Sequence, residues 1–230
     1  MSSLLAFRPQ AVIFDLDGTL VDNMPWHAQA FDAFVSRHQL PAMDMAMRER
    51  TDGKRNREIF PMLFGRDLTD AEMEALEEEK EGMYREVSSG RLQPLAGLSA
   101  LLGRLEVHGI PAGVATSGPK KNVAHTLAEI GLAGRFQVIA RGDQVQRGKP
   151  APDVFLHAAR LIGVAPEACL AFEDAPLGVA AARSAGMMCV AVTSSYADEV
   201  FVSSSLQPHY TCHNFQAYLD GPGRWLLESR

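Results

Sequence analysis

Short apolar runs alternate with amphipathic stretches over most of the chain. Residues 11–16 form an apolar run that ends at Asp and Gly, which is typical of a buried strand leading into a loop. From residue 98 onward, helical spacing of apolar residues and further apolar runs follow one another, and glycines stand where several helices should end. The later expected elements are strands at 112–116, 137–140, 169–172 and 188–193 and helices at 98–105, 122–130, 153–162 and 177–185. This alternation predicts an α/β fold with a doubly wound, mostly parallel sheet and helices on both faces.

The segment between the first strand and this repeating block has helical periodicity and no clear strand. Pro25 suits the first turn of a helix. Thr69 and Glu72 form a capping-box pattern ahead of a long helix that should end near Gly90. We therefore predict an inserted helical cap domain, residues 23–91, and an α/β core domain made of residues 1–22 and 92–230.

Composition narrows the class of protein and its partners. Of the 230 residues, 47% are hydrophobic and 22% charged, which is ordinary for a globular protein, and the net charge of −6 argues against general nucleic-acid binding. Neither a signal sequence nor an apolar stretch long enough to span a membrane is evident. The three cysteines are too scattered for a disulfide framework. We expect a cytoplasmic protein, monomeric as a working assumption, with no nucleic-acid or membrane partner.

Paired acidic residues follow two of the expected strands. Asp15 and Asp17 come directly after the first strand, and Glu173 and Asp174 follow the strand at 169–172. The carboxyl ends of parallel strands share one edge of a sheet, where open α/β sheets bind ligands. A surface Asp-Gly turn is the simpler reading of Asp17 and Gly18, but repelling carboxylates are better explained by cation binding or acid/base chemistry. Mg²⁺, which prefers oxygen ligands, suits such a site.

Two further segments offer groups that could bind phosphate. Thr116, Ser117 and Gly118 end a strand before a helix, where a hydroxyl and free backbone N–H groups can bind an anion, although these residues also simply cap helices. Lys149 lies in a loop before the next helix. By itself such a lysine is more often solvated, so the order of the four segments along the chain is the stronger indication.

That order resembles the haloacid dehalogenase superfamily, across nearly the whole chain. The resemblance is closest to its branch of β-phosphoglucomutase-like enzymes and sugar phosphatases, on the segments at 14–20, 148–153 and 172–174. It implies a Rossmann-like core with a helical cap. It also implies an Asp15 nucleophile, an Asp17 general acid/base, phosphate contacts at Thr116, Ser117 and Lys149, and Mg²⁺ held by Asp15, Asp17 through its backbone carbonyl, Glu173 and Asp174.

Some positions extend or depart from that pattern. His27 matches a histidine that the branch carries on the first cap helix, and we expect it to help Asp17 hold a proton, although such a histidine is often only structural. Asn23 stands where Ser or Thr is frequent, and Ala175 follows the last acidic pair where a small hydroxyl residue is common. Both departures leave the catalytic groups in place but make the substrate harder to predict.

The cap is expected to select the substrate by closing over the leaving group. Candidate contacts are a polar, largely basic loop and one lysine on the long cap helix, namely Gly53, Lys54, Arg55, Asn56 and Lys80. If these basic residues point inward rather than to solvent, a substrate with a second anionic or hydroxyl-rich group is favoured.

The function expected from these residues is Mg²⁺-dependent hydrolysis of small phosphomonoesters, with sugar phosphates as the favoured partners, through a phosphorylated Asp15. The alternative is a β-phosphoglucomutase-like phosphomutase, in which a second sugar-phosphate hydroxyl accepts the phosphoryl group. A phospho-accepting signalling domain fits less well, because it would need neither Asp17 nor the inserted helices. A dehalogenase is disfavoured by Asp17 and the second acidic pair.

Overall fold

The core of the protein is a parallel sheet whose strands follow the apolar runs of the sequence. The computed structural model describes residues 6–202 and 207–228. Its sheet has six strands in the order β3-β2-β1-β4-β5-β6, all paired in parallel. The strands are β1 (Ala11–Phe14), β2 (Ala112–Thr116), β3 (Val138–Arg141), β4 (Cys169–Glu173), β5 (Met188–Val192) and β6 (Tyr210–Cys212). The fold predicted from the alternating pattern is confirmed.

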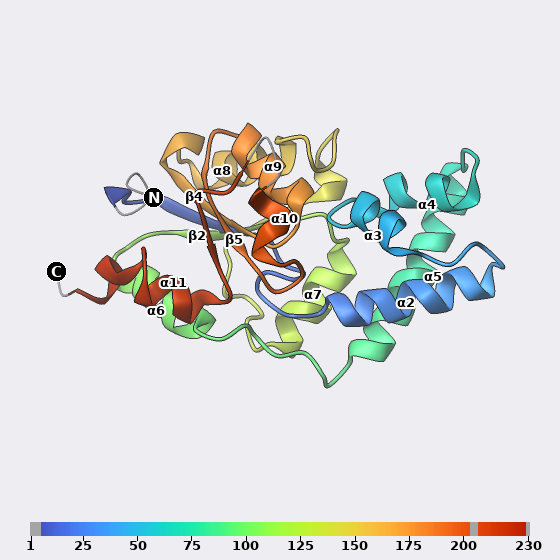
Figure 1. Cartoon of the computed structure of the whole chain (residues 1–230), viewed down its shortest axis with the longest axis horizontal. Helices are drawn as coiled ribbons and strands as arrows, with labels where there is room; N and C mark the ends of the chain where they lie inside the picture. Colours follow the sequence, from blue (N-terminus) through green and yellow to red (C-terminus); the bar gives the residue numbers. More distant parts are fainter. Residues whose placement is uncertain (1–5, 203–206, 229–230) are drawn as a thin grey trace.

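Helices cover both faces of this sheet. On one face lie α6 (Leu98–Val107), α7 (Lys120–Glu129) and α11 (Phe215–Asp220), and on the other α8 (Asp153–Ile162) and α9 (Pro176–Ser184) (Figure 1). Successive residues of a strand point to opposite faces, so Val12 and Phe14 join one apolar cluster, whereas Ala11 and Ile13 join the other. The remaining elements of the core are α10 (Asp198–Val202), η1 (Gly142–Gln144), η2 (Pro166–Ala168) and η3 (Arg224–Leu227).

The sequence pattern placed the end of the first strand two residues too late, shifted the bounds of three later strands by one residue, and missed one strand. The first apolar run continues to Leu16, but the strand ends at Phe14, and Asp15 makes one further backbone hydrogen bond to β4. The sixth strand, β6, was not predicted, since it has only three residues and no apolar run of its own. The three cysteines are buried and free.

A group of helices lies beside the core, between β1 and α6. They are α2 (Met24–Arg37), α3 (Met45–Thr51), α4 (Asn56–Phe64) and α5 (Asp70–Ser88), at the right of Figure 1. The predicted capping box is confirmed: Thr69 accepts from the backbone N–H of Glu72, whose carboxylate accepts from the N–H of Thr69. These helices pack around an apolar cluster of their own that includes Phe34, Phe60 and Met73.

Two chain segments connect this helical region to the core, and they lie next to each other. Val21 and Pro94 form an isolated antiparallel bridge, and the N–H of Leu95 donates to the carbonyl of Leu20 at 3.0 Å. The pairing holds the first turn of α2 close to the end of β1, where the site residues begin. Within the described part of the chain, no helix is long and apolar enough to cross a membrane.

Candidate active site

The loop after β1 carries Asp15 and Asp17 over the carboxyl edge of the sheet. The N–H of Asp15 donates to the carbonyl of Phe172 at 2.9 Å, which ties the start of the loop to β4. Gly18 follows with φ of +79°, and a Cβ atom there would lie 2.0 Å from Asp174 Oδ2. Only glycine allows both this conformation and this approach, so Gly18 is needed to bring the two acidic segments together.

Lys149 lies between the two acidic segments. It is 2% exposed, and its Nζ donates to Asp15 Oδ1 at 2.6 Å and to Glu173 Oε1 at 2.5 Å. The second oxygen of Glu173 accepts the backbone N–H groups of Asp174 and Ala175, each at 2.8 Å. Burial lowers the pKa of Lys149, but the charges of Asp15 and Glu173 more than offset it, so the pKa is raised. Lys149 is therefore a buried cation beside Asp15, and not a solvated surface residue.

Three carboxylates gather where a cation could bind. Oxygens of Asp15, Glu173 and Asp174 all lie within 4.8 Å of one another, and all three residues are buried. Asp174 also accepts from Thr19 Oγ1 at 3.2 Å and from Ser195 Oγ at 2.5 Å, which orients it. A buried set of carboxylate oxygens fits Mg²⁺, a hard cation that is often held by only a few protein oxygens.

The electrostatics of this cluster also favour a cation. Burial raises the pKa of Asp15 to about 7, against the lowering effect of Lys149, while Glu173 and Asp17 raise it further. Burial and the neighbouring charges of Glu173 and Asp15 raise the pKa of Asp174 well above its ordinary value. One lysine thus does not balance the carboxylates around it.

Asp17 lies outside the three-carboxylate cluster, and its partners favour its charged form. Its Oδ1 accepts from Asn23 Nδ2 at 2.6 Å and lies 3.5 Å from His27 Nε2. Burial raises the pKa of Asp17, but His27, Asn23 and Lys80 outweigh burial, and the pKa is lowered. The expectation that His27 helps Asp17 to hold a proton is therefore corrected: the contact stabilises the carboxylate.

Asn23 has a role that sequence reasoning missed. It precedes α2, but its side chain does not cap that helix. Its Oδ1 accepts the N–H of Gly18 at 3.0 Å, and its Nδ2 donates to Asp17 and to the hydroxyl of Tyr84. An Asn before a helix is normally interpreted as an N-cap. The only sequence feature that could have indicated the contact with Asp17 was that Asn replaces the Ser or Thr that is frequent at this position.

The predicted phosphate contacts lie at the same edge of the sheet. Thr116 is 2% exposed, and its hydroxyl accepts the N–H of Gly118 at 2.9 Å. Ser117 donates through its hydroxyl to the carbonyl of Gly53 at 2.6 Å. Thr116 lines the same cavity as the carboxylates, while the side chain of Ser117 joins the core to the helical region.

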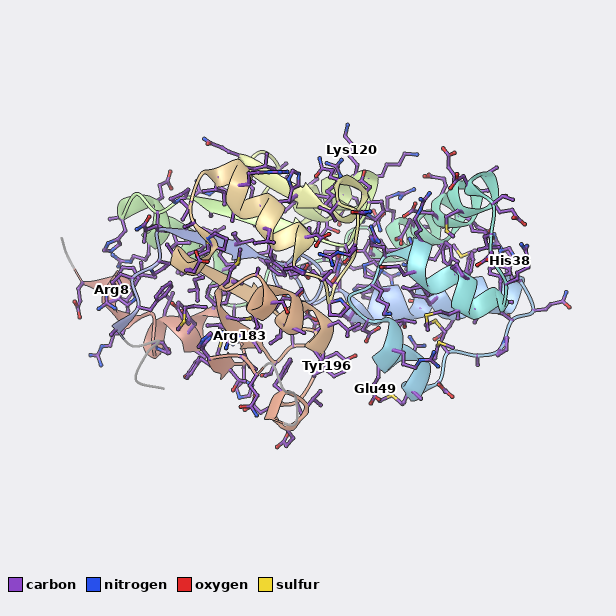
Figure 2. All side chains as sticks on the ribbon, turned by 90° about the horizontal axis from the view of Figure 1, so that it is seen from above. Arg8, His38, Glu49, Lys120, Arg183 and Tyr196 are labelled. Carbon is purple, nitrogen blue, oxygen red and sulfur yellow. The ribbon has the colours of Figure 1, made fainter. Side chains whose placement is uncertain are left out.

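A cavity of about 440 Å³ lies between the carboxyl edge of the sheet and the helical region. Asp15, Asp17, Thr116, Lys149 and Asp174 line its core side. Tyr196, in the loop after β5, lies beside α3, which carries Glu49 (Figure 2), and donates to Asp52 Oδ2 at 2.6 Å. The cavity is therefore bounded by both regions of the molecule.

Four of the five predicted cap residues reach this cavity. Its lining includes Gly53, Lys54, Asn56 and Lys80. Arg55 does not line it: the guanidinium donates to the carbonyls of Gly142 and Val145, at 3.0 and 3.1 Å, and to Glu58. Arg55 therefore connects the helical region to the core.

The arrangement matches a known family. Residues 12–192 match the family described as haloacid dehalogenase-like hydrolase. The chain belongs to this family. The resemblance drawn from the four sequence segments is thereby confirmed.

Relatives of this haloacid dehalogenase-like hydrolase include both phosphatases and a mutase. It is 36% identical to protein CbbY of Rhodobacter capsulatus, over 81% of this chain and 86% of the relative. It is 35% identical to the β-phosphoglucomutase of Bacillus subtilis, with 80% and 83% covered, and 32% identical to the fructose-1-phosphate phosphatase YqaB of Escherichia coli, with 80% and 97% covered. These relatives place the chain in the branch expected from its sequence.

Solved structures share the whole architecture. A haloacid dehalogenase hydrolase of family IA, variant 3, from Entamoeba histolytica has a TM-score of 0.81 at 25% identity, with 95% of this chain and 99% of that chain covered. CbbY of Rhodobacter sphaeroides in complex with phosphate has a TM-score of 0.78 at 26% identity, with 92% and 96% covered.

Proposed function

We propose that this chain is a Mg²⁺-dependent phosphatase of small phosphomonoesters, with sugar phosphates as the favoured substrates, and that Asp15 is its nucleophile. The observation that carries the proposal is the buried Lys149, which bridges Asp15 and Glu173 beside the cavity. A phosphatase and a phosphoglucomutase among the relatives support phosphoryl transfer as the chemistry. We also propose that residues 23–91 act as a cap domain.

Asp15, Glu173 and Asp174 would hold the metal ion, with the backbone carbonyl of Asp17 as a further ligand. When bound, Mg²⁺ supplies positive charge that stabilises the phosphoryl oxygens. Lys149 adds a second positive charge beside Asp15, and the hydroxyl of Thr116 provides a donor for a phosphoryl oxygen. Together these groups offset the repulsion between a carboxylate and a phosphate dianion.

The reaction would proceed in two steps on Asp15. A carboxylate oxygen of Asp15 forms a bond to phosphorus as the ester P–O bond breaks, and Asp17 gives a proton to the leaving alcohol. Water then attacks the phosphorylated Asp15, Asp17 takes the proton of that water, and inorganic phosphate leaves. The lowered pKa of Asp17 suits the second step. In the first step the negative charge of a bound ester would raise that pKa and help Asp17 to hold a proton.

Hydrolysis is favoured over mutase chemistry by the cations of the helical region. A mutase must hold a second phosphate, but Lys80 is already paired with Glu81 at 2.9 Å, and Arg55 does not reach the cavity. Lys54 lines the cavity and forms no salt bridge within residues 6–202 and 207–228. This position of Lys54 is the reason that a phosphomutase remains the second candidate. The large cavity argues against a signalling domain, which needs no substrate pocket.

A panel of phosphomonoesters tests this proposal. Phosphate release is measured with Mg²⁺ and with EDTA, and a hexose 1-phosphate is assayed with its bisphosphate for conversion to the 6-phosphate. A phosphatase releases phosphate from one or more esters only when Mg²⁺ is present. Isomerisation without phosphate release would replace the phosphatase with the mutase, and turnover that EDTA leaves unchanged would contradict both.

A further inference from the structure

A buried carboxylate on α5 connects the core to the Asp17 side of the cavity. Glu81 is 3% exposed, and its Oε1 accepts from Lys80 Nζ at 2.9 Å and from Asn56 Nδ2 at 2.6 Å. Its Oε2 accepts a short hydrogen bond from Asn122 Nδ2, on the core helix α7. Burial raises the pKa of Glu81, but Lys80, His27 and Asn56 outweigh it and lower the pKa. Glu81 is therefore a fully compensated, ionised group at the contact between the two regions.

Lys80 extends this contact to His27. Its Nζ lies 3.2 Å from His27 Nδ1 and 4.1 Å from the centre of the Phe31 ring. An ammonium group has only donors, so Nδ1 must accept, and a neutral His27 then carries its proton on Nε2. That nitrogen lies 3.5 Å from Asp17 Oδ1. This tautomer turns an N–H, and not a lone pair, toward the acid/base carboxylate.

We propose that Glu81 is a positioning residue, which acts through Lys80 to set the tautomer of His27 beside Asp17. The inference rests on the proposed function, because it concerns the same site. The carboxylate of Glu81 pairs with the ammonium group of Lys80 and holds it beside Nδ1, and Asn122 ties Glu81 to the core that carries Asp17. Without that carboxylate, Lys80 loses the ion pair that holds its ammonium group beside Nδ1. Nδ1 then no longer has to accept a hydrogen bond, and the other tautomer becomes available.

Variants at the side-chain amide of Asn122 can distinguish this positioning role of Glu81 from a simple packing role. Asn122 Oδ1 already accepts from Arg85 Nη1 at 2.8 Å, so the amide cannot turn over without losing that bond. Glu81→Gln keeps the shape of the side chain but places an NH₂ group against Asn122 Nδ2 or against Lys80. Combining it with Asn122→Asp restores an acceptor opposite the new amide. The double variant repairs the contact between α5 and α7 but still lacks the carboxylate that faces Lys80.

The test compares wild type, Glu81→Gln, the double variant and Glu77→Gln. Glu77 is a matched control, because it lies one turn earlier on α5 and accepts only a 3.3 Å bond from Asn56. Each protein is assayed for kcat, KM and the free energy of unfolding in urea. The ¹⁵N shifts of the His27 ring, which distinguish the two neutral tautomers, are recorded over a range of pH and are assigned by difference from His27→Gln.

We expect Glu81→Gln to lower kcat on the order of ten-fold, with KM within about two-fold, and to give a mixture of His27 tautomers. The double variant should regain the free energy of unfolding but neither kcat nor the single tautomer. Glu77→Gln should match wild type in all three measurements.

Two results would overturn the proposal. One is a Glu81→Gln protein that keeps kcat and the Nε2–H tautomer. The other is recovery of both kcat and tautomer in the double variant, which would make Glu81 a packing residue. A wild-type protein that hydrolyses no ester would end the proposed function instead, and the ring-nitrogen shifts would still decide the role of Glu81.

Discussion

The two sides of the cavity treat charge in different ways. On the core side, the buried carboxylates of Asp15, Glu173 and Asp174 cluster beside a single buried lysine, Lys149. Burial and mutual repulsion raise the pKa of two of them, and Asp15 reaches about 7. This side has an excess of buried negative charge, a state that is costly unless a cation is bound.

On the helical side, the two buried charges of α5 are partners of each other, and the partly buried Arg55 is also paired. Lys80 pairs with Glu81, and Arg55 pairs with Glu58 and two core carbonyls. The pKa of Glu81 is lowered by its partners despite its burial. The difference teaches that buried charge alone does not mark a catalytic group. Charges at a cavity that do not balance one another are a better indication of a catalytic site, because only such charges are stabilised by binding an ion or a ligand.

Loss of the nucleophile should give the largest effect on the core side. Asp15→Asn leaves the shape of the site but removes the attacking oxygen charge, so kcat should fall by at least about 10³-fold. Asp143→Asn is the control, because Asp143 pairs with Arg141 near the surface of the α/β core. Phosphate release measured under Mg²⁺ saturation checks both variants. Turnover close to that of wild type in Asp15→Asn would refute the nucleophile assignment.

Removing one lysine from each side compares the two kinds of charge directly. Lys149→Met leaves Asp15 and Glu173 buried without their cation and should lower the free energy of unfolding by about 3–5 kcal/mol in EDTA. Lys80→Met leaves Glu81 with two amide donors and should cost only about 1–3 kcal/mol. Urea unfolding measures both. Equal losses would show that the two sides do not differ as described.

Mg²⁺ binding should release protons, because the metal-free site holds them. The pKa of Asp15 is raised from 3.8 to about 7, so this group binds a proton more readily in the folded than in the unfolded chain. Its contribution to the free energy of unfolding therefore falls as pH rises from about 4 to 7, and saturating Mg²⁺ should remove that fall.

Calorimetry of Mg²⁺ binding in buffers of different ionisation enthalpy checks this linkage. About one proton or more should be released per ion near pH 6, and fewer near pH 8. Proton release that is absent near pH 6 would mean that the carboxylates are already ionised without metal.

The smallest expected effects concern Lys54 and Arg55, two adjacent basic residues of the helical region that should have different roles. Arg55→Met should lower the free energy of unfolding by about 1–3 kcal/mol with little change in KM, because it leaves the carbonyls of Gly142 and Val145 without a donor. Lys54→Met should leave stability unchanged and raise KM only for esters with a second anionic group. The reverse pattern would place Arg55, and not Lys54, in contact with substrate.

Much of the architecture could be predicted because apolar periodicity reports burial directly. The parallel sheet, the helices on both faces and the inserted helical segment all follow from spacing and from residues such as Thr69 and Glu72. Strand β6 was missed because three residues are too few to show a period.

Part of the candidate site could be predicted from the sequence for a different reason. Residues that follow parallel strands meet at one edge of the sheet, so Asp15, Thr116 and Asp174 could be placed together. Lys149, in the loop before α8, was added only through the resemblance to a known family. No such rule predicts the direction of a side chain within the helical region. Spacing therefore did not distinguish Arg55, which holds the core, from Lys54, which lines the cavity.

The chain by itself specifies its elements, its family and the kinds of group at the sheet edge, since these depend on local pattern and on the connectivity of a parallel sheet. Three-dimensional packing alone determines the balance of charge. Burial and neighbouring groups set the opposite pKa shifts of Asp15 and Asp17, which lie two residues apart. Packing also brings Asn23 to Asp17 and Glu81 to Asn122. Electrostatic free energy depends on distance and solvent exposure, and neither quantity is written in the order of residues.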